Sequence, residues 1–206
     1  MNKQGLREIK KEATAHALAE AAFQLTLERG IDGFVVEDVV RSAGYSRRTF
    51  ANYYSCKEEA VAMSAVPYHG TEEFIDLVDR LPENTSPLDL VYQLTKMQLT
   101  GDVIRKLRQL AELSKEYPSL EPYTLSVVHG LQTKAQELLN DLFAGQYSAG
   151  YTHLLVGAAY SAIYPLLEGS VRVLLPGQTA DEAPDAISFD EYIDTAFGYL
   201  RNGFQI

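Results

Sequence analysis

Side chains that can contact DNA bases or phosphates gather between Arg41 and Lys57 of this 206-residue chain. An arginine can donate two hydrogen bonds to the edge of a guanine, and an asparagine can pair with an adenine. A threonine can touch a thymine methyl group or a phosphate, while tyrosine and lysine suit phosphate contacts, which fix register without reading sequence. The candidate contacts are Arg41, Ser46, Arg47, Arg48, Thr49, Asn52, Tyr53 and Lys57.

Two short helices joined by a tight turn would present these side chains on one surface. Apolar residues recur at helical spacing over residues 36–43, which predicts one amphipathic helix. Gly44 lies where a left-handed backbone would end that helix, and Ser46 is a good N-cap for a second one. On the second helix Phe50 and Tyr54 share a face that packs inward. The pattern predicts a helix-turn-helix, and a helical hairpin with merely solvated arginines is the alternative.

Residues 17–60 resemble the N-terminal DNA-binding domain of TetR-type transcriptional regulators. The resemblance covers the segments ALAEAAFQLTLERGID, VEDVVRSAGYS and RRTFANYYSCKEEA. They are similar to the first helix of the family ending in Glu-Arg-Gly, to its second helix, and to its recognition helix with a Tyr-aromatic pair and a Ser-x-Lys-Glu start to helix four. Three positions depart from the family pattern, where Thr, an aromatic residue and Phe are frequent: Val35, Ala51 and Thr26.

The resemblance implies an all-α fold of about nine helices. Residues 1–60 would form the helix-turn-helix DNA-binding domain, and residues 61–206 the ligand-binding and dimerisation domain. A homodimer would place two recognition helices on one face of a palindromic operator. We therefore expect a ligand-responsive repressor that a small-molecule effector releases from DNA. The alternative is an α-helical adaptor or ligand-binding protein of the same fold that has lost DNA binding.

The formal net charge of -10 is distributed unevenly along the chain. Residues 1–60 hold nine basic and nine acidic residues, whereas residues 61–206 hold nine basic and nineteen acidic ones. This asymmetry should weaken nonspecific adhesion to DNA and direct binding through the surface of Arg47, Arg48 and Lys57. Either a basic arm or a frayed, solvated terminus accounts for the first cations of the chain, Lys3, Arg7, Lys10 and Lys11.

Composition indicates a soluble, cytoplasmic protein that does not associate with membranes. Hydrophobic residues make up 46% of the chain, enough for a substantial core. No apolar run is long enough to span a membrane, and the N-terminus lacks the apolar core of a signal peptide. A single cysteine, Cys56, excludes an intramolecular disulfide and fits a reducing compartment. An incidental small residue at a helix start explains it better than a redox switch does.

Beyond residue 60 the pattern predicts helices that are separated by Pro and Gly. We expect helix four from Lys57 to about Ala65, with Pro67 and Gly70 at the joint between the two halves. The later helices are expected at about residues 86–100, 101–116, 119–143, 148–174 and 189–202.

The last two of these helices are the expected dimer interface. The first of them carries small residues that permit close approach, and the second carries an apolar stripe, so the pair can pack against its own copy across a two-fold axis. The alternative is that both helices close a monomeric core.

The effector site is expected on the middle helices, where aromatic side chains and polar tips are typical of a small-molecule cavity. A bound effector would, by resemblance, shift helix four and change the separation of the recognition helices. Core tyrosines show the same pattern, and no ligand class is predicted. The candidates are Tyr92, Met97, Tyr123, Val127, His129, Tyr160 and Tyr164.

Catalysis is not expected from this sequence. The four histidines are not spaced as a metal site, and neither a Gly-rich phosphate loop nor a nucleophile elbow occurs. Paired acids such as Glu58 and Glu59 fall at expected helix starts, where the helix dipole favours them. We therefore expect no enzyme, no metal and no cofactor.

Overall fold

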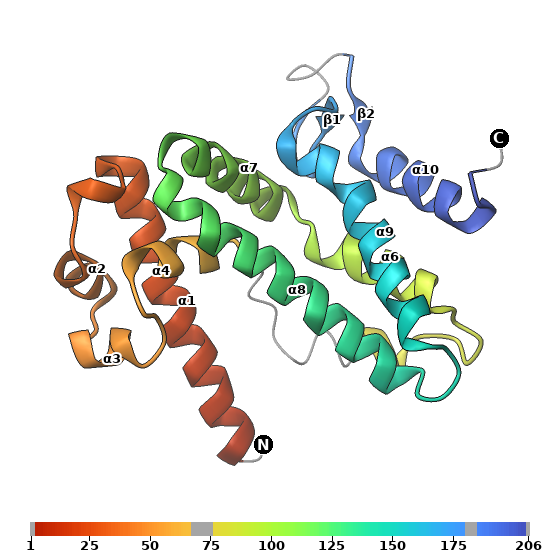
Figure 1. Cartoon of the computed structure of the whole chain (residues 1–206), viewed down its shortest axis with the longest axis horizontal. Helices are drawn as coiled ribbons and strands as arrows, with labels where there is room; N and C mark the ends of the chain where they lie inside the picture. The colour runs from red at the N-terminus through yellow and green to blue at the C-terminus, as the bar shows by residue number, and fades with distance from the viewer. Residues whose placement is uncertain (1–2, 67–75, 180–184, 205–206) are drawn as a thin grey trace. The chain divides into compact units, whose positions relative to one another are not determined.

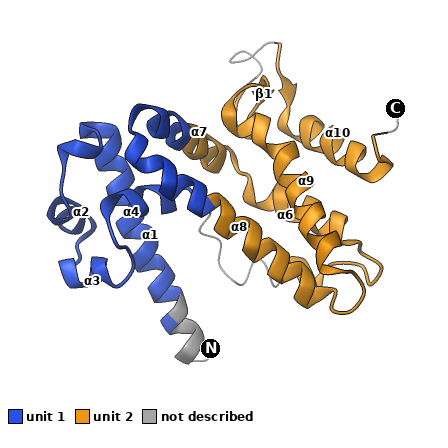
Figure 2. Cartoon of the chain, in the orientation of Figure 1, with its two compact units in different colours: residues 1–74, 109–127 blue, residues 75–108, 128–206 orange. Residues whose placement is uncertain are grey.

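A computed structural model describes residues 3–66, 76–179 and 185–204, which are predominantly helical (Figure 1). This confirms the expected all-α fold class. The chain divides into two compact units (Figure 2). Unit 1 contains residues 1–74 and 109–127, and unit 2 contains residues 75–108 and 128–206. The functional boundary expected at residue 60 stays a prediction, since compactness and function divide a chain differently.

The N-terminal part of unit 1 consists of α1 (Lys3–Arg29), η1 (Ile31–Gly33), α2 (Val36–Ala43), α3 (Arg47–Ala51) and α4 (Lys57–Met63). α1 packs against α2 and α4. The apolar face of α1 supplies Leu18, Ala22 and Phe23 to the buried core. Val39 of α2 is also fully buried there. Burial of such side chains contributes on the order of 1.5 to 3 kcal/mol each. The core thus fixes the positions of the short helices.

A later segment of the chain completes unit 1. It comprises the second half of α7 (Gly101–Glu116), η2 (Pro118–Leu120) and the start of α8 (Glu121–Leu142). η2 packs against α4, and Leu120 is fully buried. Gly30 has a φ of +70°, and a Cβ there would lie 2.6 Å from the hydroxyl oxygen of Tyr117. The left-handed φ favours glycine here, so Gly30 of the Glu-Arg-Gly sequence has a local structural reason.

Unit 2 contains the first half of α7, the larger part of α8, and four further elements. These are α6 (Pro87–Gln98), α9 (Ala149–Glu168), the short strands β1 (Val173–Leu174) and β2 (Ile187–Ser188), and α10 (Phe189–Asn202). Serine hydroxyls at the N-caps accept hydrogen bonds from backbone N–H groups in the first turns of α6, α9 and α10. One buried cluster joins Ile104, Leu166 and Phe197, and a second joins Leu90, Leu139 and Val156.

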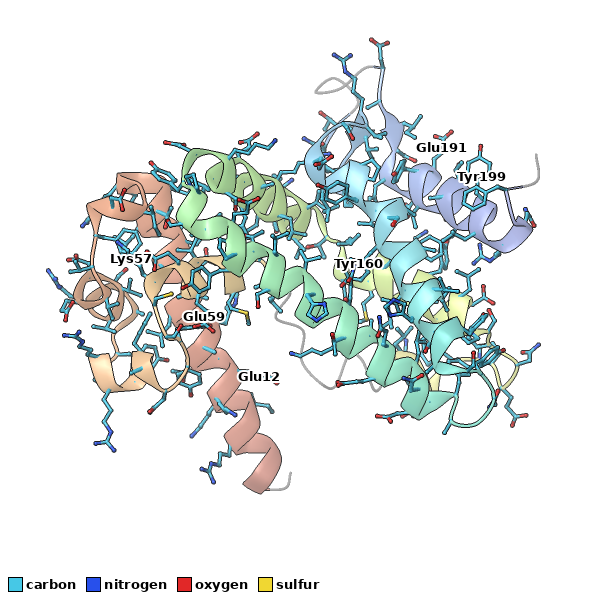
Figure 3. All side chains as sticks on the ribbon, viewed as in Figure 1. Glu12, Lys57, Glu59, Tyr160, Glu191 and Tyr199 are labelled. Carbon is cyan, nitrogen blue, oxygen red and sulfur yellow. The ribbon has the colours of Figure 1, made fainter. Side chains whose placement is uncertain are left out.

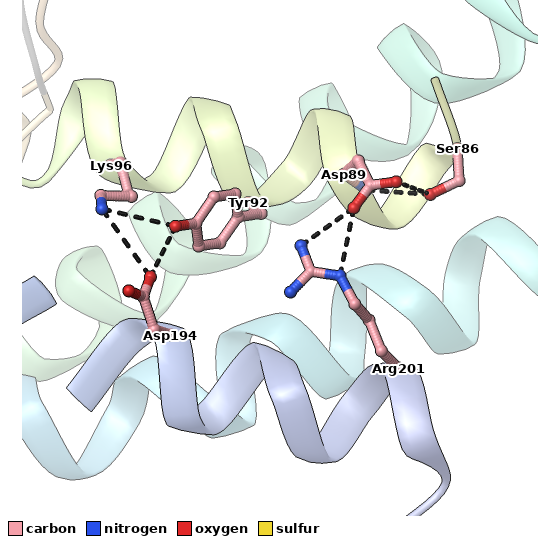
Figure 4. Close-up of polar contacts among 6 residues, drawn as sticks. All are labelled: Ser86, Asp89, Tyr92, Lys96, Asp194 and Arg201. Carbon is pink, nitrogen blue, oxygen red and sulfur yellow. Dashed lines mark hydrogen bonds and ion pairs between the residues drawn. The ribbon is translucent and has the colours of Figure 1, made fainter. Parts of the chain in front are cut away.

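Polar contacts attach α10 to α6 (Figure 4). Asp89 Oδ1 accepts from Nε and Nη2 of Arg201 at 3.1 and 2.9 Å. Its other oxygen accepts from the hydroxyl of Ser86 at 2.6 Å. One turn along α6, the Tyr92 hydroxyl donates to Asp194 at 2.5 Å, and the guanidinium of Arg201 lies 5.0 Å from the centre of the Tyr92 ring. These contacts hold the side of α10 that carries Asp194 and Arg201 against α6.

Two helix ends differ from expectation. The helix expected over residues 148–174 ends at Glu168, because Gly169 adopts a left-handed conformation with a φ of 73° and closes it. Residues 173–174 then form β1, which pairs in parallel with β2. α4 ends at Met63, slightly before the expected Ala65, and the expected joint at Pro67 and Gly70 lies outside the described residues.

The described residues contain neither a membrane-spanning helix nor a cluster of metal ligands. No helix there is both long and apolar enough to cross a membrane. Within the same residues, no group of three or more His, Cys, Asp or Glu side chains could hold a metal ion.

Candidate nucleic-acid interface

The turn between α2 and α3 has the geometry that its sequence predicts. Gly44 is left-handed with a φ of 74°, and its N–H group bonds the carbonyl of Val40. Ser46 then caps α3 by accepting from the N–H group of Thr49 at 3.0 Å. Val40 and Phe50 are buried between the helices, so the opposite face of α3 remains in solvent.

The C-terminal end of α3 is anchored to α1. The hydroxyl of Tyr54 donates to the carbonyl of Ala15 at 2.8 Å, and its ring lies 5.7 Å from that of Phe50. Burial, and to a lesser extent the Glu59 carboxylate, raises the pKa of Tyr54 to about 12. The hydroxyl therefore stays a neutral donor, and α3 is held at both ends.

The predicted DNA contacts of α2 and α3 lie on the solvent side of this motif. Arg41, Ser46, Arg47, Arg48 and Asn52 are exposed, and Thr49 and Tyr53 are partly exposed. The hydroxyls of Ser46 and Thr49 bond each other at 2.8 Å, which leaves the methyl group of Thr49 as its freer contact. The structure therefore brings seven of the eight candidates together on one helix-turn-helix.

The sequence model of a family described as bacterial regulatory proteins, tetR family, matches residues 18–62. The chain carries a tetR-family DNA-binding domain. The match begins inside α1 and ends near the end of α4, so it includes every element of the motif described above. No curated protein matches the chain. With its tetR-family domain, the protein is a DNA-binding transcriptional regulator, and the resemblance noted in the sequence is confirmed.

Lys57 occupies a different setting from the other candidates of the tetR-family domain. Its Nζ donates to the carbonyls of Ile31 and Phe34 at 2.6 and 2.9 Å, and it lies 5.1 Å from the centre of the Phe34 ring (Figure 3). Two of its three donors are thus bonded to the backbone before α2. This geometry supports a positioning role for Lys57, and the phosphate contact expected of it stays a prediction.

Two arginines of the DNA-binding surface are paired with acids of α2. Nη1 of Arg47 lies 2.6 Å from Oε1 of Glu37, and Nη2 of Arg41 lies 2.8 Å from Oδ1 of Asp38. Asp38 also accepts from the N–H group of Val35 at 3.1 Å. Since Val35 has no side-chain acceptor, the carboxylate of Asp38 supplies the side-chain part of this cap. The contact of Glu37 with Arg47 was not predictable from the sequence, because helical spacing within α2 cannot show a contact with α3.

The start of α4 is stabilised by a local cap that was not predicted from the sequence. Glu59 accepts from the N–H group and from the hydroxyl of Ser55, both at 2.6 Å. The sulfur of Cys56 accepts from the N–H group of Glu59 at 3.4 Å. These bonds give Cys56 a structural role at the N-cap. A Ser followed by Glu at a helix start was the available signal.

The seven candidate effector residues do not gather in one unit. Tyr123 and Val127 belong to unit 1, and the other five belong to unit 2. Within unit 2 the side chains of His129 and Tyr164 are exposed, and Tyr164 donates to Glu168 at 2.5 Å. Tyr160 is partly buried, and burial raises the pKa of its hydroxyl to about 12. The effector site stays a prediction.

An apolar hollow of unit 2 lies elsewhere, between α9 and α10. It has a volume of about 430 Å³ and is open to solvent. It is lined by Ala158, Ser161, Ala162, Pro165, Ile187, Tyr192, Thr195, Ala196, Tyr199, Leu200 and Phe204. Leu154 of α9 is 73% exposed, and Phe204, which follows α10, is 71% exposed. We call this surface the α9–α10 groove.

Proposed function

We propose that this protein is a homodimeric, ligand-responsive repressor that binds a palindromic operator through α3. The observation that carries the proposal is the anchored recognition helix, with Arg47, Arg48 and Asn52 facing solvent within a tetR-family domain. Arg47 and Arg48 would make base or near-base contacts, Thr49 and Asn52 groove contacts, and Tyr53 a phosphate contact. A dimer would repeat these contacts at two half-sites.

The α9–α10 groove supports the homodimer. Tyr151, Leu154, Ala158 and Pro165 lie along one side of α9 at spacings of three, four and seven residues, which form a continuous stripe on a helix. Ala158, Ser161 and Ala162, which line the groove, are small and allow a second helix to approach closely. Large exposed apolar side chains beside them are unusual on a monomer, and a second copy would bury them.

Sedimentation velocity would test this interface. The wild-type protein should sediment as a dimer at micromolar concentration, and Tyr199→Glu should give a monomer, because it places a charge in the groove. Leu125→Glu is the matched control, since Leu125 is 62% exposed on α8 and lies outside the groove. A wild-type monomer, or a dimer that Tyr199→Glu leaves intact, would contradict the proposal.

An unsatisfied cation in unit 2 supports effector binding there. Nε of Arg108 donates to the carbonyl of Leu166 at 2.9 Å, whereas its buried Nη2 has no hydrogen-bond partner among the described residues. A buried charged donor without an acceptor is costly, so an acidic group on an effector would be stabilised there. A thermal-shift screen that compares carboxylic acids with matched amides would test this, with release of DNA as the second readout. An acid that stabilises the protein without altering DNA affinity would contradict the switch.

Selection from a random pool of double-stranded DNA at physiological salt would test the core of the proposal. The wild-type protein should enrich a palindrome, and an Arg47→Ala/Arg48→Ala double variant should not. If neither protein enriches a sequence, in the presence or absence of effector candidates, the adaptor hypothesis would replace the repressor hypothesis. The net charge of zero over residues 1–60 is what favours that second candidate.

A further inference from the structure

We propose that Glu37 is a specificity-determining residue of the DNA-binding surface. It holds the guanidinium of Arg47 for a base contact and opposes its use as a nonspecific phosphate contact. This inference rests on the proposed function, because it assumes that α3 reads an operator.

The contact between the two side chains crosses the helix-turn-helix. Glu37 lies in the first turn of α2, and Arg47 is the first residue of α3. Their charged atoms are 2.6 Å apart, although 76% of the Arg47 side chain and 49% of the Glu37 side chain are exposed. The pair of Arg41 and Asp38, in contrast, lies within α2. Glu37 therefore ties the first side chain of the recognition helix to the neighbouring helix.

The pairing leaves Arg47 able to read a base. A guanidinium has five N–H donors in a fixed plane, and Nη1 is the nitrogen that lies next to Glu37. Nε and Nη2 can still make the two-bond contact with a guanine. Fixing one end of a flexible side chain reduces the number of conformations that binding must remove. Glu37 should thus favour the contact in which Arg47 points at a base edge.

The same carboxylate disfavours binding to an arbitrary sequence. A cation that approaches phosphate releases condensed counterions, which drives nonspecific binding. A paired Arg47 contributes less to this effect, and Glu37 brings a negative charge toward the phosphates. Every DNA sequence meets this repulsion, whereas only the operator offsets it through base contacts. Arg48, which is exposed next to Arg47, has no acidic partner in the described part of the chain, so its charge attracts any DNA sequence in addition to the near-base contact proposed for it.

The test compares Glu37→Gln with the wild-type protein on the selected operator and on random DNA. The substitution keeps the size of the side chain and removes its charge. We expect random DNA to bind about threefold to tenfold more tightly, with a salt slope steeper by about one counterion, and operator affinity to change less. Glu121→Gln is the control for the charge change, because Glu121 is exposed on α8 in unit 1, outside the helix-turn-helix.

A second variant separates orientation from charge. Glu37→Asp keeps the negative charge and shortens its reach, so the gain in affinity for random DNA should be smaller than with Glu37→Gln, while operator affinity falls. If Glu37→Gln and Glu121→Gln change the ratio of operator to random affinity equally, the inference is overturned. That result would leave the proposed function intact, since the wild-type protein would still select its operator. A wild-type protein that selects no sequence would instead overturn the proposed function and this inference with it.

Discussion

At the scale of single residues, Lys57 shows how one side chain can satisfy a family pattern and have another physical role. Its ammonium bonds two carbonyls that precede α2, over the ring of Phe34. The spacing of residues around Lys57 predicts exposure near DNA, but it contains no information about carbonyls 23 and 26 residues away in sequence. A positioning role and a phosphate contact of Lys57 predict different effects of its substitution on stability and on the salt dependence of DNA binding.

We predict that Lys57→Met lowers the free energy of unfolding by about 1 to 3 kcal/mol, because two partly buried carbonyls lose a charged donor. DNA affinity should fall modestly for all sequences, while its salt slope should not change. Chemical denaturation and a salt titration of binding would measure the two effects. Arg48→Met is the control, and it should lower the salt slope by about one without affecting stability. A lower salt slope for Lys57→Met would instead indicate that Lys57 contacts a phosphate.

Arg47 and Glu37 form a pair whose members should respond differently to truncation. Arg47→Ala should cost about 1 to 3 kcal/mol at the operator and relax the base preference at one position of each half-site. Quantitative binding to operators with single base changes would detect this. Equal losses on operator and random DNA would remove Arg47 from direct readout.

At the scale of elements, helix starts were predicted well, and so were most helix ends, but the end of α9 was not. The start of α6 at Ser86 and Pro87 and the start of α10 at Phe189 follow from capping chemistry, which is local in sequence. The end of α9 at Gly169 was missed because the apolar residues that follow continue a plausible helical pattern. Their pairing as β1 with β2 depends on residues more than ten positions later.

The contact between α6 and α10 makes stability depend on pH. Hydrogen bonds from Ser86, and then from Arg201, hold the pKa of Asp89 below its ordinary value. A carboxyl whose pKa is lowered by folding contributes stability above its unfolded pKa and loses it as the pH falls through the folded value. The wild-type protein should therefore lose stability below about pH 4, by less than about 1 kcal/mol from this exposed pair.

Urea denaturation between acidic and neutral pH would measure that loss. Asp89→Asn should be less stable at neutral pH and should show a smaller decrease on acidification. Asp102→Asn is a suitable control, because Asp102 pairs with Arg105 within α7 and does not join two helices. An identical pH dependence for Asp89→Asn and the wild-type protein would contradict the role of Asp89.

At the scale of the whole molecule, the proposed dimer links stability to protein concentration. If the α9–α10 groove is buried in a dimer, folding and association are coupled, and the thermal midpoint rises with concentration. We predict this rise for the wild-type protein and its absence for Tyr199→Glu. Calorimetry over a hundredfold range of concentration would decide the matter. A midpoint that does not depend on concentration would indicate that the groove remains open to solvent.

The two units also show what sequence reasoning could not reach. The helix-turn-helix was predictable because its turn, cap and apolar spacing are all local. The candidate effector residues were chosen by residue type along separate helices, and the fold then placed Tyr123 in unit 1 and Tyr160 in unit 2. Residue type alone does not determine which helices become neighbours.

The hydroxyl of Tyr117 over Gly30 has a practical consequence for protein engineering. Residues 109–127 are part of the body that contains the recognition helix, although more than thirty residues of chain separate them from its N-terminal segment. A chimera that joins this N-terminal segment to another regulator at residue 60 would lose the partner of Gly30 and leave the surface beneath η2 uncovered. Transfer of the DNA-binding part to another regulator would therefore require residues 1–74 together with residues 109–127.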